Sequence, residues 1–138
     1  MNITHPLKRL YPWLIWSLAA IFYAYEFFQR VSPNIMVPQL MHAFHVQADG
    51  IGIMGSCFYW AYVIMQIPAG LLVDRFGAHK LLSLAIISLM VGTALLSISN
   101  SIYLASAARG LIGFGSSFAF VCTLKLITRW FPAAKFAL

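Results

Sequence analysis

Four long stretches of the chain are dominated by hydrophobic side chains, with few charged residues inside them. A transmembrane helix needs about 20 such residues to cross the ~30 Å hydrocarbon core of a bilayer. The stretches at 51–73 and 81–99 contain no Asp, Glu, Lys or Arg, whereas those at 11–37 and 102–125 contain a few charged side chains. The pattern therefore predicts an all-α, polytopic membrane protein with four transmembrane helices, followed by the start of a loop at 126–138.

The overall composition agrees with a membrane location. Hydrophobic residues make up 62% of the chain and charged residues 9%, and the mean hydropathy is +0.84. Soluble proteins contain roughly a quarter charged residues. The lipid bilayer is thus the expected surrounding of the chain. The two cysteines are expected to pack inside helices and the four histidines to lie in loops, and because their spacing is not that of metal ligands, no metal or cofactor is expected.

The positively charged residues predict how the helices are oriented. Lys and Arg are enriched in the cytoplasmic loops of membrane proteins. The loops at 38–50 and 99–101 contain none, whereas seven of the nine lie on the opposite side. These seven are Lys8, Arg9, Arg75, Lys80, Lys125, Arg129 and Lys135. The N-terminus is therefore predicted to be cytoplasmic, in a plasma membrane of the bacterial inner-membrane type.

Charge and motif content argue against two classes of function. A net charge of +6 and a pI near 9.7 could indicate a surface that binds nucleic acid. The enrichment of Lys and Arg on one side of the membrane accounts for this excess of positive charge, however. No separate basic cluster remains that could bind nucleic acid. An enzyme is not expected either, because the sequence has no nucleophile with a base, no paired carboxylates and no phosphate-binding loop.

Three charged side chains lie deep inside the predicted spans. Such a residue at the middle of a membrane helix costs on the order of 2.5–3.5 kcal/mol on insertion scales. Arg109 lies in the fourth span, and Glu26 and Arg30 lie four residues apart in the first, on one helical face. Either Glu26 and Arg30 only neutralise each other, or all three side chains face a water-filled pathway for a polar or anionic solute.

Polar residues recur at helical spacing in two other places. The second span has Tyr59, Tyr62 and Gln66 at intervals of three and four residues, and in the fourth span Ser116 follows Arg109 by seven. These faces either line the same pathway or form hydrogen bonds between helices.

Small residues in the fourth span predict close contact between helices. Gly113 and Ser117 are four residues apart, a spacing that lets helix backbones touch, and Gly115 lies between them. We expect these three residues to serve helix packing, and they indicate nothing about the solute.

The turn between the second and third spans contains a motif. Residues 70–80 read GLLVDRFGAHK. This stretch resembles the signature loop between helices 2 and 3 of the major facilitator superfamily, in which a Gly is followed by Asp, a basic residue, a second Gly and further basic residues. His79 stands where the family usually has Lys or Arg. The matching residues are Gly70, Asp74, Arg75, Gly77 and Lys80.

A second stretch resembles the same superfamily. Residues 109–117 read RGLIGFGSS and are similar to its fourth-helix signature, although Ile112 replaces the frequent Gln. Members usually have twelve helices in two six-helix halves, with the solute bound between the halves. The resemblance implies that residues 1–138 form part of the N-terminal half, about the first third of a typical member, and that the missing C-terminal helices are its partners.

The resemblance also implies roles for individual residues. Asp74 and the basic residues of the loop would latch the two halves at their cytoplasmic ends, while its two glycines would allow the tight turn and close packing. Arg109 would be linked to protonation of a nearby acid, for which Glu26 is the intramembrane candidate. Arg30 lies where the organic-anion and sugar-phosphate transporters of the superfamily often place a substrate-binding charge.

The sequence thus predicts a fragment of a secondary active transporter that moves a small polar or anionic solute by alternating access, coupled to protons or another ion. One alternative is a truncated, non-transporting membrane protein or a partner subunit. Another is a four-helix small multidrug carrier in which Glu26 binds cationic drugs. Arg30 and Arg109 argue against this carrier, because they would repel a cation.

Overall fold

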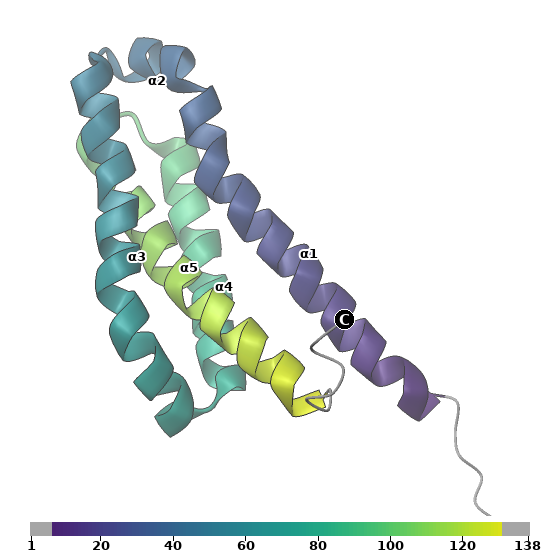
Figure 1. Ribbon diagram of the computed structural model, residues 1–138. Helices are drawn as coiled ribbons and strands as arrows, with labels where there is room; N and C mark the ends of the chain where they lie inside the picture. The colour runs from purple at the N-terminus through teal and green to yellow at the C-terminus, as the bar shows by residue number, and fades with distance from the viewer. Residues whose placement is uncertain (1–6, 131–138) are drawn as a thin grey trace, which may run out of the picture.

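The computed structural model describes residues 7–130, which form helices joined by short connections. Figure 1 shows α3 and α4 as a pair joined at one end, α5 running obliquely across both, and α2 at the other end of the bundle. The prediction of an all-helical protein is confirmed for the described residues. The helices are α1 (Leu7–Ile35), α2 (Val37–Phe44), α3 (Ala48–Phe76), α4 (Ala78–Ile98) and α5 (Ile102–Trp130).

Three helices of the described region are long and apolar enough to cross a membrane, namely α3, α4 and the part of α5 at Ile102–Lys125. They correspond to the second, third and fourth predicted spans. The helix α1 has 29 residues but is not among the three, which were found among the described residues only. Four spans are therefore confirmed only in part, and the first one stays a prediction.

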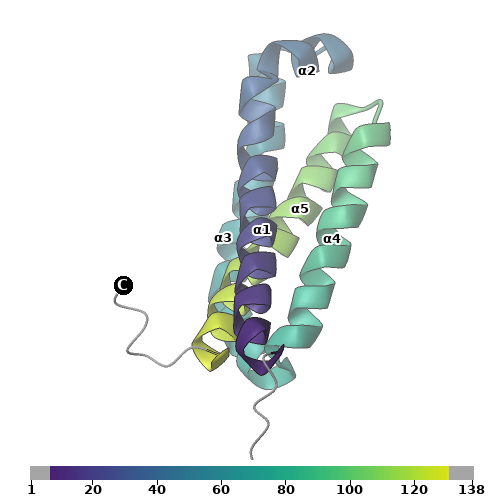
Figure 2. The same cartoon turned by 90° about the vertical axis from the view of Figure 1, so that its right-hand side faces the viewer.

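The segments that contain most of the Lys and Arg residues lie at the same end of the bundle. The N-terminal end of α1, the junction of α3 with α4 and the C-terminal end of α5 lie at one end, in both Figure 1 and Figure 2. The helix α2 and the α4–α5 connection lie at the other end. The side chains of Lys8, Arg9 and Arg129, and the whole of Lys135, lie outside the described residues.

Helix α5 is central, because it packs along both α3 and α4. A Cβ added at Gly113 would lie 2.2 Å from the carbonyl oxygen of Phe58 on α3, and one at Gly115 would lie 2.9 Å from the carbonyl oxygen of Ala85 on α4. Ser117 is fully buried and its hydroxyl donates a hydrogen bond of 2.7 Å to a carbonyl of α5 itself. The backbones can approach this closely only because both positions lack a side chain.

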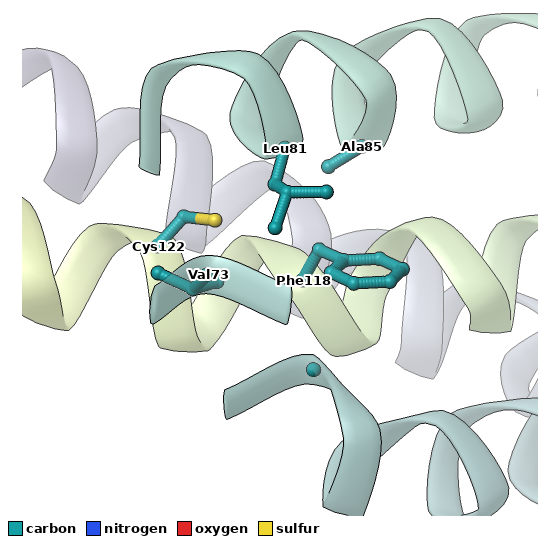
Figure 3. Packing of buried hydrophobic residues seen from close by; sticks show 6 residues of the cluster. Val73, Leu81, Ala85, Phe118 and Cys122 are labelled. Atoms are coloured by element: carbon teal, nitrogen blue, oxygen red, sulfur yellow. The ribbon is translucent and has the colours of Figure 1, made fainter. Parts of the chain in front are cut away.

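A hydrophobic cluster fixes the three helices near the α3–α4 junction. Val73 and Leu81 stand on either side of that junction and pack with side chains from the facing helices (Figure 3). Phe118 and Cys122 of α5 contribute the opposite side of the cluster. The junction is thus held rigidly against α5 by apolar packing.

The junction itself consists of one residue. The predicted loop at 74–80 is mostly helical, since α3 continues through Phe76 and α4 begins at Ala78. Gly77 has a φ of 87°, a conformation that favours glycine, and its N–H donates to the carbonyl of Val73 at 3.0 Å. His79, expected in a loop, accordingly lies in the first turn of α4.

Two further helix ends differ from the predicted ones. The loop predicted at 38–50 contains α2, which has a proline in its first turn, where a fixed φ favours helix initiation, and which includes His42. Helix α5 continues to Trp130, so residues 126–130 of the predicted loop are helical instead. The hydrocarbon thickness sets the length of the apolar span, but a helix can continue beyond it. Residues 131–138 of that predicted loop lie outside the described part.

Candidate functional site

The helix α1 presents an ion pair toward the other helices. Arg30 donates from Nη2 to Oε1 of Glu26 over 2.7 Å, as the spacing of four residues along a helix allows. The Glu26 side chain is 2% exposed, whereas that of Arg30 is 25% exposed. A carboxylate this deeply buried is stable only with a charged partner, which Arg30 supplies.

Arg109 joins α5 to the same part of α1. Its side chain is 2% exposed, and Nη1 donates a hydrogen bond of 3.0 Å to the backbone carbonyl of Gln29. The Nε atoms of Arg109 and Arg30 are both buried and find no hydrogen-bond partner within residues 7–130. Each arginine therefore keeps a buried N–H group for which a hydrogen-bond acceptor would be strongly favoured.

The ring of Phe58, from α3, lies beside both cations. Its centroid is 4.7 Å from Cζ of Arg109 and 5.7 Å from Cζ of Arg30. Tyr62 stacks on Phe58 with the ring planes 9° apart, and its own centroid is 4.7 Å from Cζ of Arg30. The negative faces of these rings stabilise the guanidinium charges where water is scarce. Phe58 itself is fully buried.

Gln29 connects three helices at this place. Its side-chain amide donates to the hydroxyl of Tyr25 at 2.8 Å and to the hydroxyl of Thr93, on α4, at 2.6 Å. The Thr93 hydroxyl in turn donates to the Leu89 carbonyl over 2.7 Å. Together with the bond from Arg109 to its backbone, Gln29 holds α1 against α4 and α5.

The polar stripe predicted on α3 divides into two parts. Gln66 donates to the Tyr62 hydroxyl at 3.1 Å, so these two residues extend the cluster along α3. Tyr59 is 47% exposed and lines a shallow hollow with Ser56, Trp60 and Val63 on the outer side of that helix. Its ring still contacts the edge of Phe58, with the centroids 5.2 Å apart. On α5, Ser116 is buried and its hydroxyl has no partner among the described residues.

The charged motif at 70–80 lies away from this cluster, at the end of the bundle. The carboxylate of Asp74 forms an ion pair with Lys125 of α5, and both side chains are largely exposed. Arg75 lies over the ring of Phe76, with 5.7 Å from Cζ to the centroid, and Lys80 is exposed on the first turn of α4. A Cβ at Gly70 would meet no described atom within 4 Å.

Sequence reasoning missed four residues of these arrangements, namely Gln29, Phe58, Thr93 and Lys125. Phe58 could have been noticed, since it precedes Tyr62 by four residues on the same helical stripe. Lys125 was counted only as a cytoplasmic positive charge. The contacts of Gln29 and Thr93 join helices far apart in sequence, and no local pattern indicates them.

Replacing Phe58 by Leu tests whether its ring stabilises the two arginines. We expect the variant to lose about 2 kcal/mol of unfolding free energy, since a desolvated cation–π contact contributes roughly this much. Phe27→Leu is the matched control, because Phe27 is 55% exposed on α1. The measurement is thermal unfolding of the purified protein in detergent. Equal unfolding temperatures for the two variants would contradict the role given to the ring.

The chain is similar to known membrane transporters. The family model described as Major Facilitator Superfamily matches residues 16–138. The chain is 32% identical over 123 residues to the uncharacterized transporter YybO of Bacillus subtilis (strain 168), covering 89% of this chain. It is 28% identical over 129 residues to the probable galactarate/D-glucarate transporter GudP of the same organism, covering 89% of this chain.

A third relative is the probable sulfoacetate transporter SauU of Cupriavidus necator, 25% identical over 122 residues and 88% of this chain. The chain spans 28% of the length of each of these three relatives. No solved structure matches it significantly.

Proposed function

The chain belongs to the major facilitator superfamily, and on this premise we propose that it contributes part of the solute pathway of a secondary active transporter for a small anionic solute. Transporters of this superfamily expose a site near the middle of the bilayer alternately to the two sides. The matched region at 16–138 includes all the buried charged residues described above. Membership of this superfamily also makes the four-helix multidrug carrier the weaker reading.

The observation that supports an anionic solute most directly is the arrangement of Glu26, Arg30 and Arg109. Two guanidinium groups lie beside the Phe58 ring and one carboxylate pairs with Arg30, which leaves one positive charge without a counter-charge in the described cluster. An uncompensated buried cation is costly unless an anion is bound nearby. The unpartnered Nε groups of both arginines are suitable donors to a carboxylate or sulfonate.

The names of two relatives agree with this solute class. Galactarate, D-glucarate and sulfoacetate, which appear in those names, are all organic anions. We propose that the present chain also acts on an organic anion, without choosing among these compounds.

Uptake into membrane vesicles tests the proposal. The vesicles contain the protein expressed from its complete reading frame, and labelled D-galactonate, galactarate and sulfoacetate are compared with the uncharged polyol galactitol. We expect saturable uptake of at least one anion and none of galactitol. Uptake of the polyol at the same rate as the anions, or no uptake of any of them, would contradict an anion pathway.

We further propose that Glu26 takes part in coupling to protons, since it is a buried acid of α1 that forms an ion pair with Arg30. The N-terminus would be cytoplasmic in a bacterial inner membrane, in line with the gathering of Lys and Arg at one end of the bundle. The alternative of a non-transporting subunit would predict that the protein binds no solute by itself.

The ion pair of Asp74 with Lys125 would act as part of a latch at the cytoplasmic end. An exposed pair contributes at most about 1 kcal/mol to stability, so Asp74→Asn should hardly change the unfolding temperature. We nevertheless expect it to lower solute uptake several-fold, because the pair would favour one of the two transport states.

A double variant, Asp74→Lys with Lys125→Asp, exchanges the two charges. It tests whether Asp74 and Lys125 act by attracting each other or through other partners. If the pair acts by mutual attraction, uptake should recover at least in part in the double variant. Uptake as low as in Asp74→Asn would indicate that Asp74 acts through another partner.

A further inference from the structure

Glu26 occupies a hydrogen-bonding position of an arginine that the proposed site would offer to its solute. Its Oε1 atom accepts from Nη2 of Arg30 at 2.7 Å, and its side chain is almost completely buried. A solute carboxylate that approaches Arg30 therefore meets a protein carboxylate already in place. Glu26 thus competes with the solute carboxylate for the N–H groups of Arg30.

Resting on the proposed function, we infer that Glu26 determines the number of negative charges that the solute carries. With Glu26 ionised, the cluster of Glu26, Arg30 and Arg109 has a net charge of one positive unit. A solute with a single carboxylate neutralises that charge. A solute with two carboxylates leaves an excess negative charge in a poorly hydrated site, which is unfavourable.

In this proposal one small solute contacts both cations. Arg30 and Arg109 lie beside the same ring, that of Phe58, and each keeps a buried Nε–H without a partner in the described region. One carboxylate can accept from these groups. A second carboxylate that approaches Nη2 of Arg30 would meet the negative charge of Glu26, which already accepts from this group, and the two like charges would repel each other.

No other acid of the chain can supply the same effect. The sequence has three acids, and the other two, Asp49 and Asp74, lie in the first and last turns of α3. Around the cluster, α3 contributes the phenols Tyr59 and Tyr62, α4 contributes the neutral Thr93, and α5 contributes Arg109. Within residues 1–138, Glu26 is thus the source of negative charge at the site.

The test uses D-galactonate and galactarate, which share a six-carbon polyhydroxy skeleton and differ only in having one or two carboxylates. Their dissociation constants are measured by equilibrium binding to the purified protein, expressed from its complete reading frame. We expect the unmodified protein to bind galactonate about tenfold more tightly than galactarate. In Glu26→Gln the ratio should shift about tenfold toward galactarate, because the site gains one positive charge.

Asp49→Asn is the matched control, since it removes the same charge from an exposed position at the end of α3 and should leave the ratio unchanged. Glu26→Asp retains the charge and should keep the preference for galactonate. If Glu26→Gln does not fold, the preference of the unmodified protein still decides the matter, and tighter binding of galactarate would overturn the inference.

An unchanged ratio in folded Glu26→Gln would overturn it as well, while leaving anion transport in place. Binding of neither sugar acid, nor of sulfoacetate, would overturn the proposed function together with this inference.

Discussion

Replacing Arg109 by Ala is expected to reduce uptake of the anionic solute about 100-fold, which corresponds to about 2.7 kcal/mol. The substitution removes a buried guanidinium that donates to the Gln29 carbonyl and lies 4.7 Å from the Phe58 ring. It also leaves Glu26 and Arg30 as a neutral pair, so the net positive charge of the described cluster disappears. The measurement is initial uptake rate at a solute concentration below saturation.

Arg109→Lys separates the charge from the planar shape of the guanidinium. Lysine keeps the positive charge but offers a compact ammonium group that cannot reproduce the fork geometry of arginine. We therefore expect uptake between that of the unmodified protein and that of Arg109→Ala. The amount of each variant in the membrane is measured in parallel, and normal uptake by correctly inserted Arg109→Ala would show that Arg109 has no part in the pathway.

Replacing Gly113 by Ala is expected to destabilise the bundle by about 3 kcal/mol, the upper part of the range for overpacked cores. The added Cβ would lie 2.2 Å from the oxygen, 3.0 Å from the carbonyl carbon and 3.1 Å from the Cα of Phe58. All three are backbone atoms, so no side-chain rotation relieves the overlap, and α3 must move away from α5. Because Phe58 moves with α3, solute uptake should fall as well.

Gly110→Ala is the matched control on the same helix. Its added Cβ would have one neighbour, the Cys57 carbonyl oxygen at 3.9 Å, which is an ordinary contact. Since Ala is favoured over Gly inside a helix by roughly 0.5–1 kcal/mol, this variant should be slightly stabilised. Thermal unfolding in detergent is therefore expected to give shifts of opposite sign, and equal shifts would contradict a specific contact at Gly113.

Much of the helical arrangement could be predicted from the sequence, because the bilayer imposes a length on each apolar span. Three of the predicted spans coincide with helices that are long and apolar enough to cross a membrane. The ion pair of Glu26 with Arg30 follows from a spacing of four residues on a helix, and the structure has this pair at 2.7 Å. These features depend on local periodicity alone.

Contacts between helices could not be predicted in the same way. Phe58 shares a helical stripe with Tyr62, but this spacing does not indicate that its ring lies beside arginines from two other helices. The bonds from Gln29 to Thr93 and from Arg109 to Gln29 join residues 64 and 80 positions apart. The extent of α2 and α5 was missed for a different reason, since helices outside the hydrocarbon core are not limited by hydrophobicity.

The ring of Phe58 also restricts the order in which this site can change during evolution. Since Arg30 and Arg109 lie beside the same ring, substitutions at these three positions should not have additive effects. A lineage that first lost the aromatic ring would keep two buried cations without the ring that stabilises them. A lineage that first lost one arginine could replace the ring with a smaller loss of stability. Epistasis among positions 30, 58 and 109 is therefore expected, and descendants should keep the ring for as long as they keep both arginines.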